Sequence, residues 1–241
     1  MEEHVYPQMY RVEKEHWWFV SRNRILLNYI DRRLGLSRES KILDVGCGTG
    51  AMLEEFSRRY QAFGIDFSPQ AIDFCRKRGL ANVRVGSLDA FPRDERFDLI
   101  TMFDVVEHVE DDRGLLSEAH GRLSPGGHLL VAVPAYRWLW SNHDVVLHHK
   151  RRYTRSTLAL VVRQAGFRIE HLTHFNALLF PLALTRRVAG RLTGSNTADD
   201  LEVPSPAVNS LLGGIFRLET DWIPSMTLPF GLSLLCLAQK A

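Results

Sequence analysis

Short apolar runs alternate along the chain with longer stretches in which apolar residues recur every three or four positions. The short runs predict strands at 41–45, 62–65, 83–85, 97–103 and 128–133, and the helical periodicity predicts helices between most of them. Strands that alternate with helices at this spacing favour a doubly wound parallel sheet with helices on both faces.

The two ends of the chain depart from this alternation. The pattern over residues 4–34 predicts helical structure, and residues 134–153 predict a long polar and aromatic loop. A strand at 167–174 is followed by an apolar, partly helical insertion at 177–228, which precedes a last strand. We therefore divide the chain into an N-terminal helical lid (1–36), an α/β core (37–176), a helical insertion or cap (177–229) and the final strand of the core (230–241).

Composition narrows the class of protein. The chain has 241 residues, of which 45% are hydrophobic, and this is enough for one well-cored domain. Its 30 basic and 28 acidic side chains nearly balance, which gives no support to a nucleic-acid partner. The three cysteines are scattered, which argues against a disulfide framework or paired metal ligands. The first residues lack the apolar segment of a signal peptide, and the apolar stretches 177–184 and 222–238 are too short or too broken to span a bilayer, so we expect a cytoplasmic protein.

Three glycines, Gly46, Gly48 and Gly50, lie between the first predicted strand and the next helix. Glycines there let the backbone turn tightly and approach a ligand, and the helix start offers free N–H groups. Asp66 ends the second predicted strand, where a carboxylate can accept hydrogen bonds from both hydroxyls of a ribose. Together these features suit NAD, FAD or S-adenosyl-L-methionine (SAM).

Two details favour SAM over a dinucleotide. The spacing is Gly-x-Gly-x-Gly, whereas the dinucleotide fingerprint is Gly-x-Gly-x-x-Gly. Asp44 lies in the strand just before the loop, where it would repel a pyrophosphate and attract the cationic amino group of a methionine moiety. A dinucleotide-dependent oxidoreductase remains the alternative.

Five segments in order resemble the motifs of class I SAM-dependent methyltransferases of the type 11/12-like kind. They are ILDVGCGTG (42–50), GIDFS (64–68), GSLDAFP (86–92), FDLI (97–100) and LSPGG (123–127). The resemblance implies a Rossmann-like, seven-stranded sheet that is parallel except for one antiparallel strand, 232–238.

The resemblance also implies the cofactor contacts. The glycines would shape the loop around the methionine part of SAM, and Asp44 would lie near its amino group. Asp66 would bind the ribose, Phe67 would flank the adenine, and Asp89 would bind the adenine amino group beside the Leu88 backbone. The predicted cofactor-binding residues are Arg22, Asp44, Gly46, Gly48, Gly50, Asp66, Phe67, Ser68, Leu88, Asp89 and Phe103.

Asp104, Glu107 and His108 follow the fourth strand at a spacing that one helical turn would bring together. The segment is similar to the Glu-His segment of ubiquinone-biosynthesis O-methyltransferases, in which glutamate stands at the position of Asp104. His108 can be a general base, since its reference pKa is about 6.5. Alternatively, the trio binds a divalent metal, which the shorter Asp104 disfavours, or Glu107 and His108 only orient the loop. We predict a catalytic His108 and no metal.

The loop after the fifth strand carries the candidate acceptor-binding residues. Trp138 and Trp140 can wall a planar or apolar acceptor. Histidines offer further bases or metal ligands, and a basic run can hold a carboxylate or phosphate or simply be a solvated face. These residues are His143, His148, His149, Lys150, Arg151 and Arg152, of which we predict His143 as a second catalytic residue.

Two further segments carry expectations about partners. Within 14–24, Trp18 and Arg22 share a helix face, and Arg22 or Arg24 would meet the SAM carboxylate unless the tryptophans only pack the helix on the sheet. This segment and the histidine-rich loop together resemble a bacterial methyltransferase subgroup linked with cell-surface glycan or lipid-linked metabolism. Residues 177–192 form either a packed cap or an amphipathic surface for peripheral membrane contact.

The predicted function is transfer of a methyl group from SAM to a small-molecule acceptor. Histidines that can serve as bases favour an oxygen nucleophile, on a lipid-like, quinone-like or glycan-related substrate. Direct displacement requires the protein mainly to position the reactants and to remove a proton. A non-catalytic SAM-binding protein is the second alternative.

Overall fold

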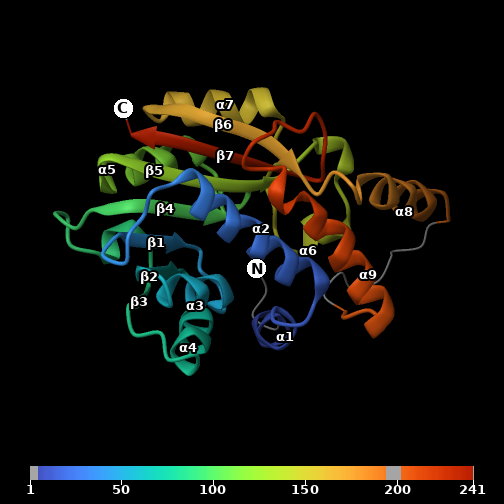
Figure 1. Cartoon of the computed structure of the whole chain (residues 1–241), viewed down its shortest axis with the longest axis horizontal. Coiled ribbons are helices and arrows are strands. Elements are labelled where there is room, and N and C mark those ends of the chain that lie inside the picture. The colour runs from blue at the N-terminus through green and yellow to red at the C-terminus, as the bar shows by residue number, and fades with distance from the viewer. Residues whose placement is uncertain (1–4, 194–201, 241) are drawn as a thin grey trace.

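The computed structural model describes residues 5–193 and 202–240, and its described strands form one seven-stranded sheet in the order β3-β2-β1-β4-β5-β7-β6 (Figure 1). Strand β7 runs antiparallel to both of its neighbours, and the other strand pairs are parallel. The predicted fold class is therefore confirmed, including the antiparallel last strand. The strands are β1 (Lys41–Val45), β2 (Gln61–Asp66), β3 (Val83–Val85), β4 (Phe97–Phe103), β5 (Leu123–Pro134), β6 (Phe167–Phe175) and β7 (Ser233–Lys240).

Helices cover both faces of the sheet and divide the core in two. On one face α2, α3, α4 and α9 bury residues such as Ile25, Phe56 and Phe216. On the other face α5 and α7 bury residues such as Leu116 and Leu158. Because β4 is covered on both faces, it is apolar almost throughout. The described helices are α1 (Val5–Val12), α2 (Trp17–Arg33), α3 (Ala51–Ser57), α4 (Pro69–Lys77), α5 (Asp112–Arg122), α6 (Asn142–Val146), α7 (Arg155–Gln164), α8 (Phe180–Thr193) and α9 (Pro206–Arg217).

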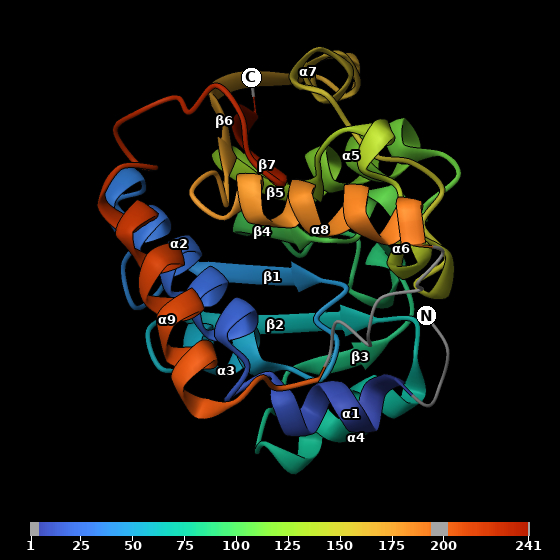
Figure 2. The same ribbon diagram turned by 90° about the vertical axis from the view of Figure 1, so that its right-hand side faces the viewer.

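The predicted helical segment 4–34 forms two helices, because the chain breaks between α1 and α2. His16 has an extended backbone conformation, and its side chain accepts a hydrogen bond from the Trp18 N–H at 3.2 Å. A polar side chain that satisfies a free N–H in this way starts a new helix. The break lets α1 lie beside α4, away from the axis of α2 (Figure 2).

The predicted strand at 128–133 forms but is longer than expected, because β5 already begins at Leu123. Gly126 has a φ of +74°, and a Cβ on Gly127 would lie 3.1 Å from the carbonyl oxygen of Phe97. The glycines therefore let the strand stay close to β4 across a register irregularity at Phe97 and Leu99.

The insertion after β6 contributes two helices with different surroundings. Helix α9 lies along α2, where the Trp17 N–H donates to Asn209 Oδ1 at 2.8 Å and Ser21 Oγ donates to the Gly213 carbonyl. Helix α8 passes in front of the β4 and β5 end of the sheet (Figure 2). Among the described helices, none has both the length and the apolar character needed to cross a membrane.

Candidate active site

The loop after β1 is shaped by its glycines. Gly46 and Gly50 have φ values of +69° and +88°, which L side chains rarely adopt. Space is also limiting: a Cβ on Gly46 would lie 2.4 Å from Val105 Cγ2, and one on Gly50 would lie 2.8 Å from Cys75 Sγ. The sequence therefore requires glycine at both positions for the loop to close over the start of α3.

Asp66 at the end of β2 lies against this loop. Its Oδ2 accepts a hydrogen bond from the Gly48 N–H at 3.0 Å, and its Oδ1 accepts one from the Ser68 N–H at 2.9 Å. Burial raises the pKa of Asp66, although these two hydrogen bonds oppose the shift. Since a carboxylate has about four acceptor sites, it keeps capacity for ligand hydroxyls. Phe67, next in sequence, is 74% exposed.

Asp44 is a buried acid in the middle of the site. It is 3% exposed, and its Oδ1 accepts a hydrogen bond from Thr101 Oγ1 on β4 at 2.7 Å. Burial raises the pKa of Asp44 to about 7, against the effect of the Thr101 hydrogen bond. A carboxyl group that loses this much hydration is stabilised in its ionised form by a nearby cation. The residues present therefore fit a nucleoside that carries a cationic amino group.

The segment after β3 continues the same edge of the sheet. The Gly86 N–H donates to the Asp66 carbonyl at 2.9 Å, which ties this segment to β2. Leu88 and Asp89 lie in a short 3-10 helix (Leu88–Ala90), with Leu88 buried and Asp89 exposed beside Ser87 Oγ, which donates to it. Both residues thus follow β3, the strand that pairs with β2.

Arg22 reaches this edge from α2. Its guanidinium pairs with the Asp104 carboxylate and lies 4.7 Å from the Trp18 ring centroid and 5.8 Å from that of Phe103. Of the two arginines considered for the cofactor carboxylate, Arg24 is exposed and Arg22 is partly buried. The shared face of Trp18 and Arg22 is confirmed by this cation–π contact.

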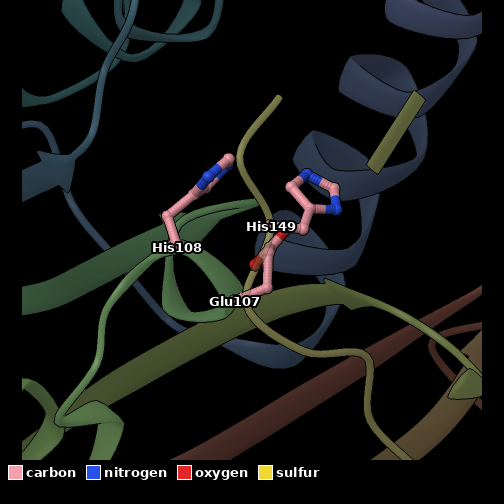
Figure 3. A group of neighbouring side chains, drawn as sticks. All are labelled: Glu107, His108 and His149. Carbon is pink, nitrogen blue, oxygen red and sulfur yellow. The ribbon is translucent and has the colours of Figure 1, made fainter. Parts of the chain in front are cut away.

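The helical turn expected to gather Asp104, Glu107 and His108 forms only in part. Asp104 has a φ of +56° and pairs with Arg22, and the following 3-10 helix spans Val106–His108. A different trio assembles instead, from Glu107, His108 and His149, with one donor atom of each within 4.8 Å of the others (Figure 3). One carboxylate and two imidazoles can hold a divalent metal or handle a proton.

Burial controls the charge of this cluster. Glu107 is fully buried, and neither of its carboxylate oxygens has a hydrogen-bond partner among the described residues. Burial, with a smaller effect of the Asp104 charge, raises the pKa of Glu107 well above its usual range. The rings of His108 and His149 meet edge to face, with centroids 4.6 Å apart. Burial and the nearby His149 lower the pKa of His108 to about 4, so His108 is neutral at pH 7.

The loop after β5 supplies His149 through contacts that sequence reasoning missed. His149 Nδ1 lies 2.9 Å from Asp144 Oδ1, and the Arg152 guanidinium donates to both oxygens of Asp144 at 2.6 and 2.9 Å. The Lys150 N–H donates to the Glu107 carbonyl at 2.8 Å, which anchors the loop to the end of β4. The only sequence signal was the pattern of an acid followed by histidine and arginine. His143 belongs to α6, but its side chain lies outside the described part of the structure, so its role stays a prediction.

Aromatic side chains gather beside this loop and under α8. Tyr136 stacks on Trp138 with centroids 5.4 Å apart, Trp138 meets Phe180 at 6.1 Å, and Phe180 meets Phe230 at 5.5 Å. Trp138 and Phe230 remain 50% and 45% exposed. Tyr136 also has a φ of +58°, and its hydroxyl lies 2.9 Å from His174 Nε2. We name Tyr136, Trp138, Phe180 and Phe230 the aromatic cluster.

Helix α1 covers the glycine loop from the other side. Met9 Cε lies 3.9 Å from where a Cβ on Gly48 would be, and Tyr10 stacks on Phe74 of α4 at 4.6 Å. Glu13 and Arg78 form an ion pair whose side chains are 6% and 4% exposed. Helix α1 therefore lies against the candidate cofactor site.

A family model described as a methyltransferase domain matches residues 19–172, which is most of the sheet and α2. The chain belongs to the SAM-dependent methyltransferases. The matched residues include the glycine loop, Asp44, Asp66 and the Glu107–His108 segment, and SAM is the cofactor of this family.

Individual relatives agree with this assignment. A ubiquinone biosynthesis O-methyltransferase from Acinetobacter baylyi is 27% identical over 180 residues, covering 65% of this chain and 76% of that protein. A SAM-dependent methyltransferase from Archaeoglobus fulgidus has a similar fold, with a TM-score of 0.57, 21% identity and coverage of 93% and 94% of the two chains. The [4+2]-cyclase SpnF is also similar in fold, with a TM-score of 0.58, 24% identity and coverage of 92% and 82%.

Proposed function

We propose that this methyltransferase acts on a hydroxyl group of a planar or apolar small molecule. The observation that carries the proposal is the cluster of Glu107, His108 and His149, which brings two imidazoles to the sheet edge beside the glycine loop. A neutral imidazole can accept the proton that a hydroxyl loses on methylation. A relative that is named as an O-methyltransferase supports the same acceptor atom.

The residues of the cofactor side divide the binding of SAM among them. The glycine loop follows the methionine part, Asp44 pairs with its amino group, and Asp66 accepts from the ribose hydroxyls. Phe67, being exposed, covers the adenine, and Asp89 accepts from its amino group beside Leu88. Arg22 shares its charge between Asp104 and the cofactor carboxylate. Ser68 and Phe103 complete the walls.

SAM supplies a methyl group whose sulfonium leaving group needs no activation. The protein therefore contributes position, exclusion of water and a proton acceptor. Helix α1 lies against the glycine loop, and α8 lies on the side of β4 and β5 (Figure 2). The acceptor oxygen lies between them, near the imidazoles.

The aromatic cluster points to the chemical class of the acceptor. Aromatic rings that stay partly exposed in a monomer are suited to contact a planar or apolar ligand. Leu182 and Arg186, both exposed on α8, extend this surface toward a lipid-like tail or a membrane. We therefore favour quinone-like or lipid-linked acceptors, with hydroxylated glycan precursors as the next class.

Two measurements test the proposed function. Isothermal titration calorimetry with SAM, S-adenosylhomocysteine and NAD should show binding of the first two only. Transfer of label from methyl-labelled SAM to a panel of catechols, hydroxylated quinone precursors, polyprenols and sugars should yield an O-methyl product. Because the fold is shared with a protein named as a cyclase, SAM binding without transfer to any acceptor would favour the non-catalytic alternative. Transfer to amines alone would contradict the oxygen acceptor.

A further inference from the structure

Asp144 is a buried anion in the acceptor loop. It is 0% exposed, and besides Arg152 it accepts a hydrogen bond from the Ser141 N–H at 2.8 Å. Burial alone would raise the pKa of Asp144, but hydrogen bonds from His149 and Arg152 outweigh burial and hold the pKa below its usual range. Asp144 is therefore ionised throughout the working pH range.

This anion fixes the protonation pattern of the His149 ring. An ionised carboxylate only accepts hydrogen bonds, so the 2.9 Å contact requires the proton on Nδ1 of His149. In the neutral ring the lone pair then belongs to Nε2. The His149 N–H also donates to the Asp144 carbonyl at 2.8 Å, which holds the backbone of the same residue. Asp144 therefore holds His149 both through its side chain and through its backbone carbonyl.

The two histidines of the cluster, His108 and His149, differ in the neighbouring groups that affect their ability to accept a proton. Burial keeps His108 neutral with a pKa of about 4, which makes it a weak base near pH 7. His149 has a carboxylate behind it that can stabilise an imidazolium. The raised pKa of Glu107 keeps this carboxyl neutral, so Asp144 is the anion that His149 meets at short range.

We propose that His149 is the general base of the methyl transfer and that Asp144 is its positioning residue; this rests on the proposed function. The Nε2 lone pair takes the hydroxyl proton while the acceptor oxygen bonds to the methyl carbon. The bond from that carbon to the sulfur breaks, and its electron pair stays on the sulfur. The positive charge of the sulfonium thus ends on the His149 imidazolium, beside Asp144.

The kinetic test compares His149→Gln, His108→Gln and Asp144→Asn with His128→Gln, a partly exposed histidine in β5 whose Nε2 lies 3.3 Å from Glu170 Oε2. With the best hydroxylated acceptor of the panel, His149→Gln should lower kcat about 10²–10⁴-fold and leave the Kd for SAM within about twofold. Asp144→Asn should lower kcat at least about tenfold with little change in KM, and His128→Gln should match the wild type. A larger loss of kcat for His108→Gln than for His149→Gln would assign the base to His108 and overturn the proposal.

A second measurement does not depend on turnover. Nitrogen-15 NMR of the wild type should show the His149 proton on Nδ1, and Asp144→Asn should mix the two tautomers, since an amide can also donate. A proton on Nε2 in the wild type would overturn the proposal even if Asp144→Asn fails to fold. Activity that EDTA removes and Zn²⁺ or Mn²⁺ restores would also overturn it, because the ring would then be a metal ligand. If the wild-type protein did not bind SAM, the proposed function itself would be contradicted.

Discussion

The candidate cofactor half and the candidate acceptor half of the sheet are built from different kinds of groups. In the cofactor half, after β1 and β2, the groups are mainly backbone N–H groups and one carboxylate, within the short segments 46–50 and 66–68. In the acceptor half, after β4 and β5, the groups are side chains from separate elements: Glu107 and His108 after β4 and His149 in the loop after β5. The cofactor half is therefore local in sequence, whereas the acceptor half is assembled by tertiary contacts.

This difference accounts for how one fold serves many acceptors. A cofactor site made of backbone and a strand-end acid survives replacement of the loops around it. The acceptor site depends on which side chains those loops bring together. If the halves are separable, substitutions in one should leave the binding function of the other unchanged.

The largest expected effect is on the cofactor half. Asp66→Ala removes the acceptor for the ribose hydroxyls and should weaken SAM binding about 10²–10³-fold, since hydrogen bonds to charged groups contribute about 1.5–3 kcal/mol each. Calorimetry measures it. Asp73→Ala, an exposed acid on α4, is the matched control and should bind SAM normally. Near-normal affinity of Asp66→Ala would remove the ribose assignment.

A smaller effect should follow pH. Asp44 has a pKa of about 7 in the free protein, and the cationic amino group of SAM favours its ionised form. SAM binding must therefore release a proton below pH 7, and the Kd should rise about tenfold between pH 8 and pH 6. Calorimetry in buffers of different ionisation enthalpy measures the released proton. A Kd that is flat over this range would mean that Asp44 does not face the cation.

Substitutions in the acceptor half should change the KM for the methyl acceptor. Trp138→Ala removes an exposed ring of the aromatic cluster, and we expect KM for a planar acceptor to rise about three- to tenfold, as loss of one stacking partner costs about 0.5–1.5 kcal/mol. The Kd for SAM should not change. Trp222→Ala, at a similarly exposed tryptophan after α9, is the control. A change in SAM affinity for Trp138→Ala would show that the halves are not separable.

The smallest effect is on stability. Because burial raises the folded pKa of Asp44 above its unfolded value, this group destabilises the free protein as pH rises from about 4 to about 7. Asp44→Asn keeps the shape of the side chain and should raise Tm by about 2–4 °C for each kcal/mol gained in the free energy of unfolding. The increase should be larger at pH 8 than at pH 5, and the variant should no longer bind SAM. Thermal melts of the free protein at both pH values check this. At pH 8, a Tm of Asp44→Asn below that of the wild type would contradict the argument that burial destabilises the ionised Asp44.

The same contrast explains what the sequence could predict. The strands and the shared helix face of Trp18 and Arg22 follow from local patterns, and the structure confirms them. The break before His16 and the early start of β5 were missed, because they depend on a side-chain cap and on a close approach to β4.

The Asp144–His149 pair was missed for a similar reason. Three histidines in one loop are equivalent by residue type, and only the burial of Asp144 distinguishes His149 from its neighbours. Likewise, the spacing that grouped Asp104 with Glu107 could not show that Arg22, far along the chain, would pair with Asp104. Long-range charge pairing leaves no periodic trace in a sequence.

The Glu13–Arg78 pair has a consequence for the order of events in a catalytic cycle. Arg78 also donates to the Thr49 carbonyl at 2.8 Å, so this buried ion pair links the ends of α1 and α4 to the glycine loop. We expect release of the spent nucleoside to require this ion pair to open and both charges to regain water, and we expect this step to be slower than the displacement itself. The first round of methylation should then run ahead of later rounds as a burst of product, with the pace of the steady state set at the N-terminal helix.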